Sequence, residues 1–276
     1  MYRMLTRIIP PGHLFGIGPP KMKTPSGTNV APICIADAAQ LRQVRDAFNP
    51  TLVVHAAGVC DLDVCEERPL WAHQINVDGC RTVVDTFGQH SRICFLSTDL
   101  VFSGENPPDG GYAEQHAADP VSIAGKTFRQ GEQAIAAAPH WSILRLGLPV
   151  GSSLNGDKGG LDWVAGRFRK KLPVTLFTDE YRSMLSCSDL ARCVVEFIGT
   201  TTEGLYHLGG PAAVSLHELG AMIIRSGGYS PALLKGITRA QEVDGPPRIG
   251  NVALNSSNVA PLLSRMPDAV LLPSVK

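Results

Sequence analysis

Three polar residues end an apolar run near the middle of the chain, and together they could bind or polarise a small molecule. The run "RICFL" is followed at once by Ser97, Thr98 and Asp99. Such a run is typical of a buried parallel strand, and ligands of α/β proteins bind where those strands end. The hydroxyl of Thr98 could bond a substrate carbonyl or satisfy loop backbone, and Asp99 could orient the substrate or cap a turn. We select Ser97, Thr98 and Asp99 as candidate catalytic residues.

A second set of residues could contact the same ligand. Tyr181 and Arg182 lie in "TDEYRS", and arginine binds phosphate through two bonds at once, although a salt bridge to a nearby acid is the competing interpretation. His55 ends the run "LVVH" as either a site residue or a buried, hydrogen-bonded histidine. We select Tyr181, Arg182 and His55 as candidate substrate-binding residues. Tyr112, in a loop rich in Gly and Pro, is interpreted as structural.

Composition limits the class of protein. The 276 residues carry 25 basic and 25 acidic side chains, so no nucleic-acid or membrane partner is expected. No apolar stretch approaches the roughly 20 residues of a membrane span, and the amino terminus does not resemble a signal peptide. Seven irregularly spaced cysteines and eight scattered histidines form no metal-binding pattern. We therefore expect a reduced, cytoplasmic protein with no metal.

The elements that must position these residues alternate between strand and helix. From residue 29 to about 150, apolar strand patterns are followed by helical spacing, which predicts a parallel sheet with crossover helices. The predicted strands are "APICIAD", "PTLVVHAAG", "SRICFLSTDLVF" and "HWSILRLGLPVG". The predicted helices are "DAAQLRQVRDAF", "PLWAHQINVDGCRTVVDTFGQH" and "AGKTFRQGEQAIAAA". The fold class is thus α/β, a Rossmann-like doubly wound parallel sheet with a small C-terminal substrate lobe.

We expect two interleaved parts: residues 1–150 as the Rossmann-like domain with an atypical, shortened amino terminus, and residues 151–276 as the substrate-binding lobe. The second part contains helical patterns in "LDWVAGRFRKKL", "DLARCVVEFIGT" and "SLHELGAMIIRSGG". Ser215 stands three residues before Glu218, the spacing of a capping box. "GLYHLGG" predicts a short strand, and the end of the chain predicts one more strand and a loosely patterned tail.

In its order of motifs the chain resembles the extended short-chain dehydrogenase/reductase superfamily, and within it the dTDP-4-dehydrorhamnose reductase branch with its sugar-nucleotide-binding relatives. The matching segments, which cover about residues 29 to 260, are "VVHAAGVCDLDVCEERP", "INVDGC", "FLSTDLVFSG", "YAEQHAADP", "LFTDEYRSMLSCSDLARCVVEFI", "GLYHLGG" and "NVALNSSNV". The resemblance implies a site role for Thr98. It also implies that Ala56, Ala57, Gly58 and Asn76 are what remains of a cofactor-binding surface.

The chain departs from the family's pattern at the position of the proton donor, which is absent. The resemblance implies a Tyr and, four residues later, a Lys in "PVSIAGKTFRQGE", where a Tyr hydroxyl protonates the substrate carbonyl and Lys holds the ribose. Those positions are Ala124 and Phe128, which can neither donate a proton nor carry a charge. Lys126 does not replace them, because two residues along a helix place it near the opposite face.

The other departure is the amino terminus. The family opens with a strand, a Gly-rich turn and a helix whose first residues receive a pyrophosphate. Here Gly12, Gly16 and Gly18 are spaced differently, prolines follow, and no helical stripe comes after them. We interpret this glycine cluster as an ordinary loop, and we expect NAD(P) to bind weakly or not at all.

Three functions from three classes remain. The first is a repurposed enzyme without redox chemistry, such as a cyclase, dehydratase, epimerase or lyase, that binds a sugar nucleotide or another polar metabolite. The second is a non-catalytic binding or regulatory subunit, with a homodimer or another protein as partner. The third is a conventional NAD(P)-dependent reductase of a keto-sugar nucleotide. We favour the first, and cofactor binding separates the third from the others.

Overall fold

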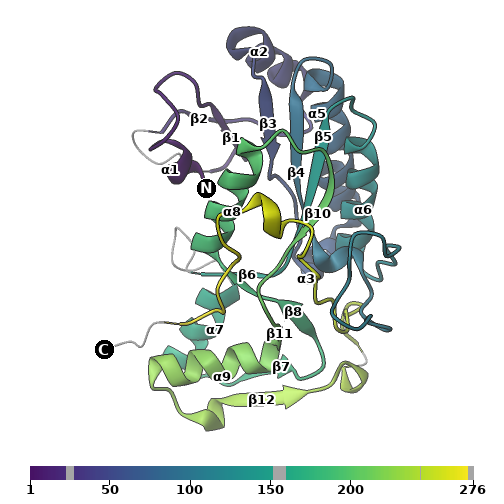
Figure 1. Cartoon of the computed structure of the whole chain (residues 1–276). Helices are drawn as coiled ribbons and strands as arrows, with labels where there is room; N and C mark the ends of the chain where they lie inside the picture. Colours follow the sequence, from purple (N-terminus) through teal and green to yellow (C-terminus); the bar gives the residue numbers. More distant parts are fainter. Residues whose placement is uncertain (23–27, 152–159, 243, 273–276) are drawn as a thin grey trace.

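A parallel four-stranded sheet is the centre of the structure, a computed structural model that describes residues 1–22, 28–151, 160–242 and 244–272. Its strands run in the order β10-β5-β4-β3, all parallel (Figure 1). Their bounds are β3 Leu52–His55, β4 Arg92–Thr98, β5 Trp141–Leu146 and β10 Gly204–Leu208. Each strand lies in one of the apolar runs identified in the sequence, so the predicted parallel sheet is confirmed.

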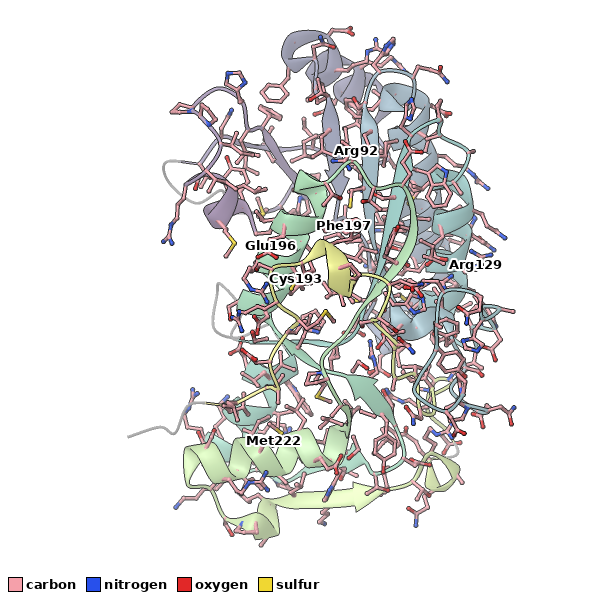
Figure 2. The ribbon with its side chains drawn as sticks, viewed as in Figure 1. Arg92, Arg129, Cys193, Glu196, Phe197 and Met222 are labelled. Atoms are coloured by element: carbon pink, nitrogen blue, oxygen red, sulfur yellow. The ribbon has the colours of Figure 1, made fainter. Side chains whose placement is uncertain are left out.

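Helices cover both faces of the sheet. On one face lie α2 (Ala38–Phe48), α5 (Gly79–Phe87) and α6 (Ile123–Ile135), whose apolar residues share a core with Phe95. On the other face lies α8 (Cys187–Gly199), which buries Cys193 and Phe197 against the sheet (Figure 2). At the start of β4, Arg92 donates two hydrogen bonds of 2.5 Å to the carbonyl oxygens of Ile198 and Thr200. These bonds fix the end of α8 to the start of β4. In the described parts of the chain, no helix combines the length and the apolar composition that crossing a membrane requires.

The predicted helix of "PLWAHQINVDGCRTVVDTFGQH" is continuous but not uniform. It begins as α4 (Pro69–His73), passes through a π-helical turn (η1, Gln74–Asp78) and continues as α5. Short π-helical turns are rare and occur often at functional sites. The turn carries Asn76, whose side chain reaches the loop after β3.

The amino terminus differs from two expectations. Gly16–Gly18 is a strand (β1) and not a loop, and it pairs in parallel with β2 (Val30–Pro32). Only the start of the predicted strand "APICIAD" is extended, and it joins this two-stranded sheet and not the central one. A short helix, α1 (Tyr2–Leu5), packs Leu5 into the α8 face of the core.

The lower part of the molecule in Figure 1 is a separate cluster of elements around its own small core. It consists of α7 (Gly160–Arg169), α9 (Leu216–Gly227), and the paired strands β7 (Val174–Phe177) with β12 (Leu234–Ile237) and β8 (Tyr181–Ser183) with β11 (Ala213–Ser215). The capping box of α9 forms as predicted: Glu218 N donates to Ser215 Oγ at 3.1 Å, and Ser215 N to Glu218 Oε2 at 2.7 Å. Because α8 and β10 return to the central sheet, the two parts of the chain interleave.

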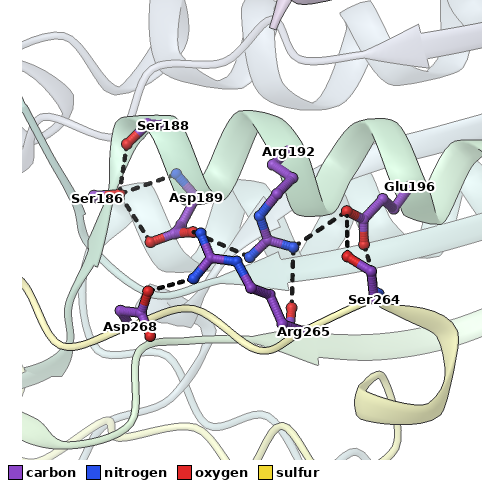
Figure 3. Close-up of polar contacts among 8 residues, drawn as sticks. All are labelled: Ser186, Ser188, Asp189, Arg192, Glu196, Ser264, Arg265 and Asp268. Carbon is purple, nitrogen blue, oxygen red and sulfur yellow. Dashed lines mark hydrogen bonds and ion pairs between the residues drawn. The ribbon is translucent and has the colours of Figure 1, made fainter.

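The carboxy-terminal segment contains isolated bridges in place of the strand predicted for it, Tyr112 with Leu254 and Tyr181 with Asn251. Farther along, a polar network ties this segment to α8 (Figure 3). Glu196 accepts hydrogen bonds from the backbone and hydroxyl of Ser264, both at 2.8 Å, and Arg192 donates to the Arg265 carbonyl at 3.0 Å. The network holds the segment across the face of α8.

Candidate functional site

The candidate site begins at the carboxyl end of β4, where Asp99 and Arg182 form a buried ion pair. Arg182 Nε lies 2.6 Å from Asp99 Oδ2, and Arg182 Nη2 donates to Asp99 Oδ1. Asp99 is fully buried, and Arg182 is 8% exposed. Burial would lower the pKa of Arg182, but the charge and hydrogen bonds of Asp99 raise it above its usual range, so the guanidinium stays charged. The structure therefore brings together two residues selected from the sequence, and it pairs them with each other.

The hydroxyl of Thr98 lies beside this pair. Its Oγ1 accepts a 3.3 Å hydrogen bond from Leu100 N and donates to Asp99 Oδ1 at 3.2 Å. Both distances are at the long end for hydrogen bonds. Thr98 therefore lies at the end of β4, as expected. Its hydroxyl forms hydrogen bonds with the two residues that follow it, which agrees with the interpretation that it satisfies loop backbone.

Helix α6 is held against this end of β4. Gly125, in the first turn of α6, approaches so closely that a Cβ there would lie 2.0 Å from the carbonyl oxygen of Leu100. Ile123 N donates to Glu66 Oε1 at 2.7 Å, which ties the start of α6 to α3 (Leu62–Glu67). These contacts fix where Ala124 and Phe128 lie relative to Thr98.

Ser97 does not face the candidate site. Side chains alternate along a strand, so Ser97 points to the α6 face, away from Thr98. There its Oγ donates to Glu132 Oε1 at 2.7 Å, and Arg145 donates two hydrogen bonds of 2.7 Å to the same carboxylate. The selection of Ser97 as catalytic is therefore not supported by its placement. The Glu132–Arg145 pair was not predicted, although Arg145, a charged residue in the otherwise apolar strand pattern "SILRLG", was the available signal.

His55 also belongs to the core. It is 2% exposed, stacks on Phe95 with ring centroids 5.1 Å apart, and places Nε2 3.3 Å from Cys80 Sγ. Burial lowers the pKa of His55 to about 4, so the ring is neutral at physiological pH. Of the two interpretations of this residue, its placement agrees with the buried, hydrogen-bonded one.

The positions of the expected Tyr and Lys are filled by apolar side chains. Ala124 is fully buried. The ring of Phe128 stacks at 6.0 Å on Phe95 and lies against the loop after β3 so closely that a Cβ on Gly58 would be 2.6 Å from Phe128 Cζ. Lys126 is exposed on another side of α6, as expected. A hydrocarbon ring thus covers the loop at the place where a ribose-binding ammonium was expected.

The remaining loop residues divide into an open and a closed group. Ala56, Ala57 and Gly58 are exposed, so their backbone is accessible to a ligand. Asn76 is 1% exposed, and its side chain is hydrogen-bonded to neighbouring residues. It accepts a hydrogen bond from Val59 N at 2.8 Å and donates to Val59 O and Thr127 Oγ1, both at 2.9 Å. Asn76 therefore positions the loop and does not itself offer a free group to a cofactor.

Two observations bear on whether a nicotinamide cofactor could bind this surface. Neither Ala124 nor Phe128 can hold a ribose or protonate a carbonyl. Between β1 and β2, no helix begins among the described residues, whereas a pyrophosphate is bound by the backbone of a helix amino terminus that directly follows a strand. In the described ranges, no three His, Cys, Asp or Glu side chains are grouped as metal ligands.

Tyr181 is half-buried and neighbours Arg182 in β8, so its side chain points to the other face of that strand. Tyr112 is structural, as interpreted, because its ring stacks on Phe102 at 4.1 Å. A hollow of about 340 Å³ lies beyond the end of β10, between Gly209–Pro211 and the segment Leu254–Ser257.

Comparison with known proteins places this geometry in a family. The family model described as the RmlD substrate binding domain matches residues 21–267. The probable low-salt glycan biosynthesis reductase Agl14 of Haloferax volcanii is 28% identical over 233 residues, which cover 82% of this chain and 76% of that protein. Methionine adenosyltransferase 2 subunit beta of Danio rerio is 34% identical over 118 residues, 42% of this chain and 35% of that protein.

Solved structures share the fold. A hypothetical dTDP-4-dehydrorhamnose reductase from Sulfolobus tokodaii has a TM-score of 0.81 at 24% identity and covers 96% of this chain and 92% of its own. The dTDP-4-dehydrorhamnose reductase of Bacillus anthracis, solved in complex with NADP, has a TM-score of 0.75 at 20% identity, with coverage of 92% and 89%.

Proposed function

The chain belongs to the RmlD substrate binding domain family, and on that premise we propose that it binds a sugar nucleotide at the carboxyl edge of β4 without transferring hydride from NAD(P)H. The names of its relatives, a glycan biosynthesis reductase and dTDP-4-dehydrorhamnose reductases, support the ligand class. The backbone of the exposed loop Ala56–Gly58 supplies an accessible polar surface for it, and the buried Thr98 hydroxyl lies at the end of the neighbouring strand β4.

One observation supports the proposal that no hydride is transferred: the Phe128 ring lies against Gly58, and Phe128 follows the buried Ala124 by four residues. A reductase of this family's type needs an acid to protonate the carbonyl, and losing a general acid alone costs a factor of roughly 100 to 10,000 in rate. Losing the cationic ribose contact as well removes cofactor affinity. The relative solved with NADP shows that the fold accepts this cofactor, so the proposal concerns these two side chains and not the architecture.

The groups that remain can bind and orient a substrate. Thr98 can donate its hydroxyl proton to a carbonyl oxygen at the edge of the sheet, and the Asp99–Arg182 pair holds Thr98 and β8 in place. Such fixed dipoles can stabilise charge that develops on a bound substrate. We therefore propose a reaction without net redox change, in the class of cyclases, dehydratases, epimerases and lyases. The seven cysteines are all free, which supports a reducing, cytoplasmic setting.

Isothermal calorimetry with dTDP-glucose, NADPH and NADH tests the proposal. We expect saturable binding of dTDP-glucose and none of either reduced cofactor at sub-millimolar concentration. The double variant Ala124→Tyr, Phe128→Lys is the matched comparison, and a gain of NADPH binding there would locate the defect in these two positions. Micromolar NADPH binding by the natural chain would contradict the proposal and favour a conventional NAD(P)-dependent reductase.

A second candidate function has a specific observation behind it. The relative from Danio rerio is named as a subunit of methionine adenosyltransferase, and it matches this chain over 118 residues at 34% identity. We propose as the alternative that this chain acts by binding another protein. Gel filtration with a purified methionine adenosyltransferase catalytic chain tests it, and co-elution in a defined ratio without any binding of dTDP-glucose would favour it.

A further inference from the structure

Glu180 is a buried acid with an oxygen that lacks a partner. The residue is 2% exposed, and its Oε2 has no hydrogen-bond partner among the described residues. A buried polar atom of this kind costs about 1–3 kcal/mol, and more when it is charged. Native structures retain few such groups, and each calls for an explanation such as a ligand or an ordered water.

The carboxyl group lies beside the candidate site. Glu180 directly precedes β8, and residues two apart along an extended chain point to the same face, so Glu180 and Arg182 lie on one side. Arg182 meets Asp99 at the end of β4 on that side. The charges of Arg182, Arg248, Asp99 and Arg239 all influence the pKa of Glu180, which agrees with this placement. The backbone of Glu180 is fixed, because its carbonyl accepts a hydrogen bond from Leu216 N at 3.1 Å.

The chemistry around Glu180 selects the ligand group. The atom without a partner, Glu180 Oε2, is a carboxyl oxygen that calls for a hydrogen-bond donor, and an ionised phosphate or carboxylate brings none. Arg182 directs Nε and Nη2 to Asp99, and among the described residues no hydrogen bond joins it to Glu180 Oε2. A neutral hydroxyl group fits best, because it can donate to Oε2 without adding charge.

We propose that Glu180 binds a hydroxyl group of the ligand's sugar ring, which places the sugar, and not the diphosphate, beside the Asp99–Arg182 pair. This inference rests on the proposed sugar-nucleotide function and adds an orientation to it. Burial raises the pKa of Glu180 despite the opposing charges of Arg182 and Arg248, which agrees with an acid that lacks a partner when no ligand is bound. A residue kept for ligand binding at a cost to stability is typical of a functional site.

Glu180→Met keeps the length of the side chain and removes both oxygens, and calorimetry with dTDP-glucose and with dTDP separates the sugar from the nucleotide. We expect Glu180→Met to weaken dTDP-glucose binding tenfold or more and to change dTDP binding less than twofold. Glu203→Gln, an exposed acid paired with His140 far along the chain, is the control and should change neither. In the absence of ligand, the urea midpoint of Glu180→Met should equal or exceed that of the natural chain.

Other outcomes would overturn the inference. Equal loss of dTDP-glucose and dTDP binding, no loss of either, or a clear fall of the urea midpoint would each show that Glu180 is structural. If the natural chain binds dTDP-glucose and Glu180→Met binds it equally well, only the role of Glu180 fails. If the natural chain binds neither compound, the proposed function fails, and the role of Glu180 fails with it.

Discussion

The carboxylate of Asp99 and the guanidinium of Arg182, 83 residues apart in the sequence, meet in a buried two-point ion pair that joins the central sheet to β8. Removing one partner from such a pair leaves an uncompensated buried charge, which costs roughly 3–5 kcal/mol. We expect Arg182→Met to lower the free energy of unfolding by about that amount, as measured by urea denaturation. The double variant Asp99→Asn, Arg182→Met should lose less than the sum of the two single variants, and losses that add up would contradict the coupling.

The contact between Gly58 and Phe128 gives a second test. Gly58→Ala places a methyl group 2.6 Å from Phe128 Cζ, and overpacking of this kind costs about 1–3 kcal/mol. Phe128→Leu shortens the side chain and should relieve part of that strain in the double variant. Thermal or urea unfolding of the four proteins checks both statements. If Gly58→Ala is neutral, the ring does not lie against this loop.

Thr98 and Ser97 are neighbours with different expected roles. Thr98→Val keeps the shape, removes the hydroxyl, and should weaken dTDP-glucose binding about tenfold, which equals about 1.4 kcal/mol. If the ligand is converted, the same variant should lower turnover at least tenfold, on the order of 1.4 kcal/mol.

Ser97→Ala is the matched control for that experiment. It removes the hydrogen bond to Glu132 and should cost about 1 kcal/mol of stability while leaving ligand affinity unchanged. Calorimetry and urea denaturation of both variants distinguish the roles, and an affinity loss confined to Ser97→Ala would reverse the assignment.

Two buried histidines predict a pH dependence of stability. Burial lowers the pKa of His55 and of His207 to about 4, from an ordinary value of 6.5. The unfolded chain therefore binds more protons between these values, so stability is fully present above pH 6.5 and falls as the pH drops towards 4. In the middle of that window the slope is about 1.4 kcal/mol per pH unit for each histidine.

His207→Gln tests the origin of this slope. Its side chain amide can still donate to the carbonyl of Tyr112, which His207 Nδ1 contacts at 2.8 Å. Urea denaturation from pH 7 to pH 4.5 should show that the variant loses about half of the slope. An unchanged slope would mean that other groups cause the acid sensitivity.

Much of the fold is determined by local patterns in the sequence. The apolar runs that become β3, β4 and β5 and the helical spacing of α2 and α6 need only the periodicity of each element. The capping box of α9 forms between Ser215 and Glu218, three residues apart. The rule that parallel strands end at one edge also placed Thr98 and Asp99 at the same edge of the sheet as the loop after β3.

The pairing of side chains was decided only by the tertiary structure. Arg182 could have faced a ligand or an acid, and its contact with Asp99 depends on how β8 packs against the end of β4. The sequence likewise could not show that Ser97 turns to Glu132, that Phe128 lies against Gly58, or that Glu180 keeps an oxygen without a partner. Periodicity tells which face of an element a residue occupies, whereas a contact depends on which other element meets that face and at what distance. Those distances are set by packing across the whole core, so they exist only in the folded chain.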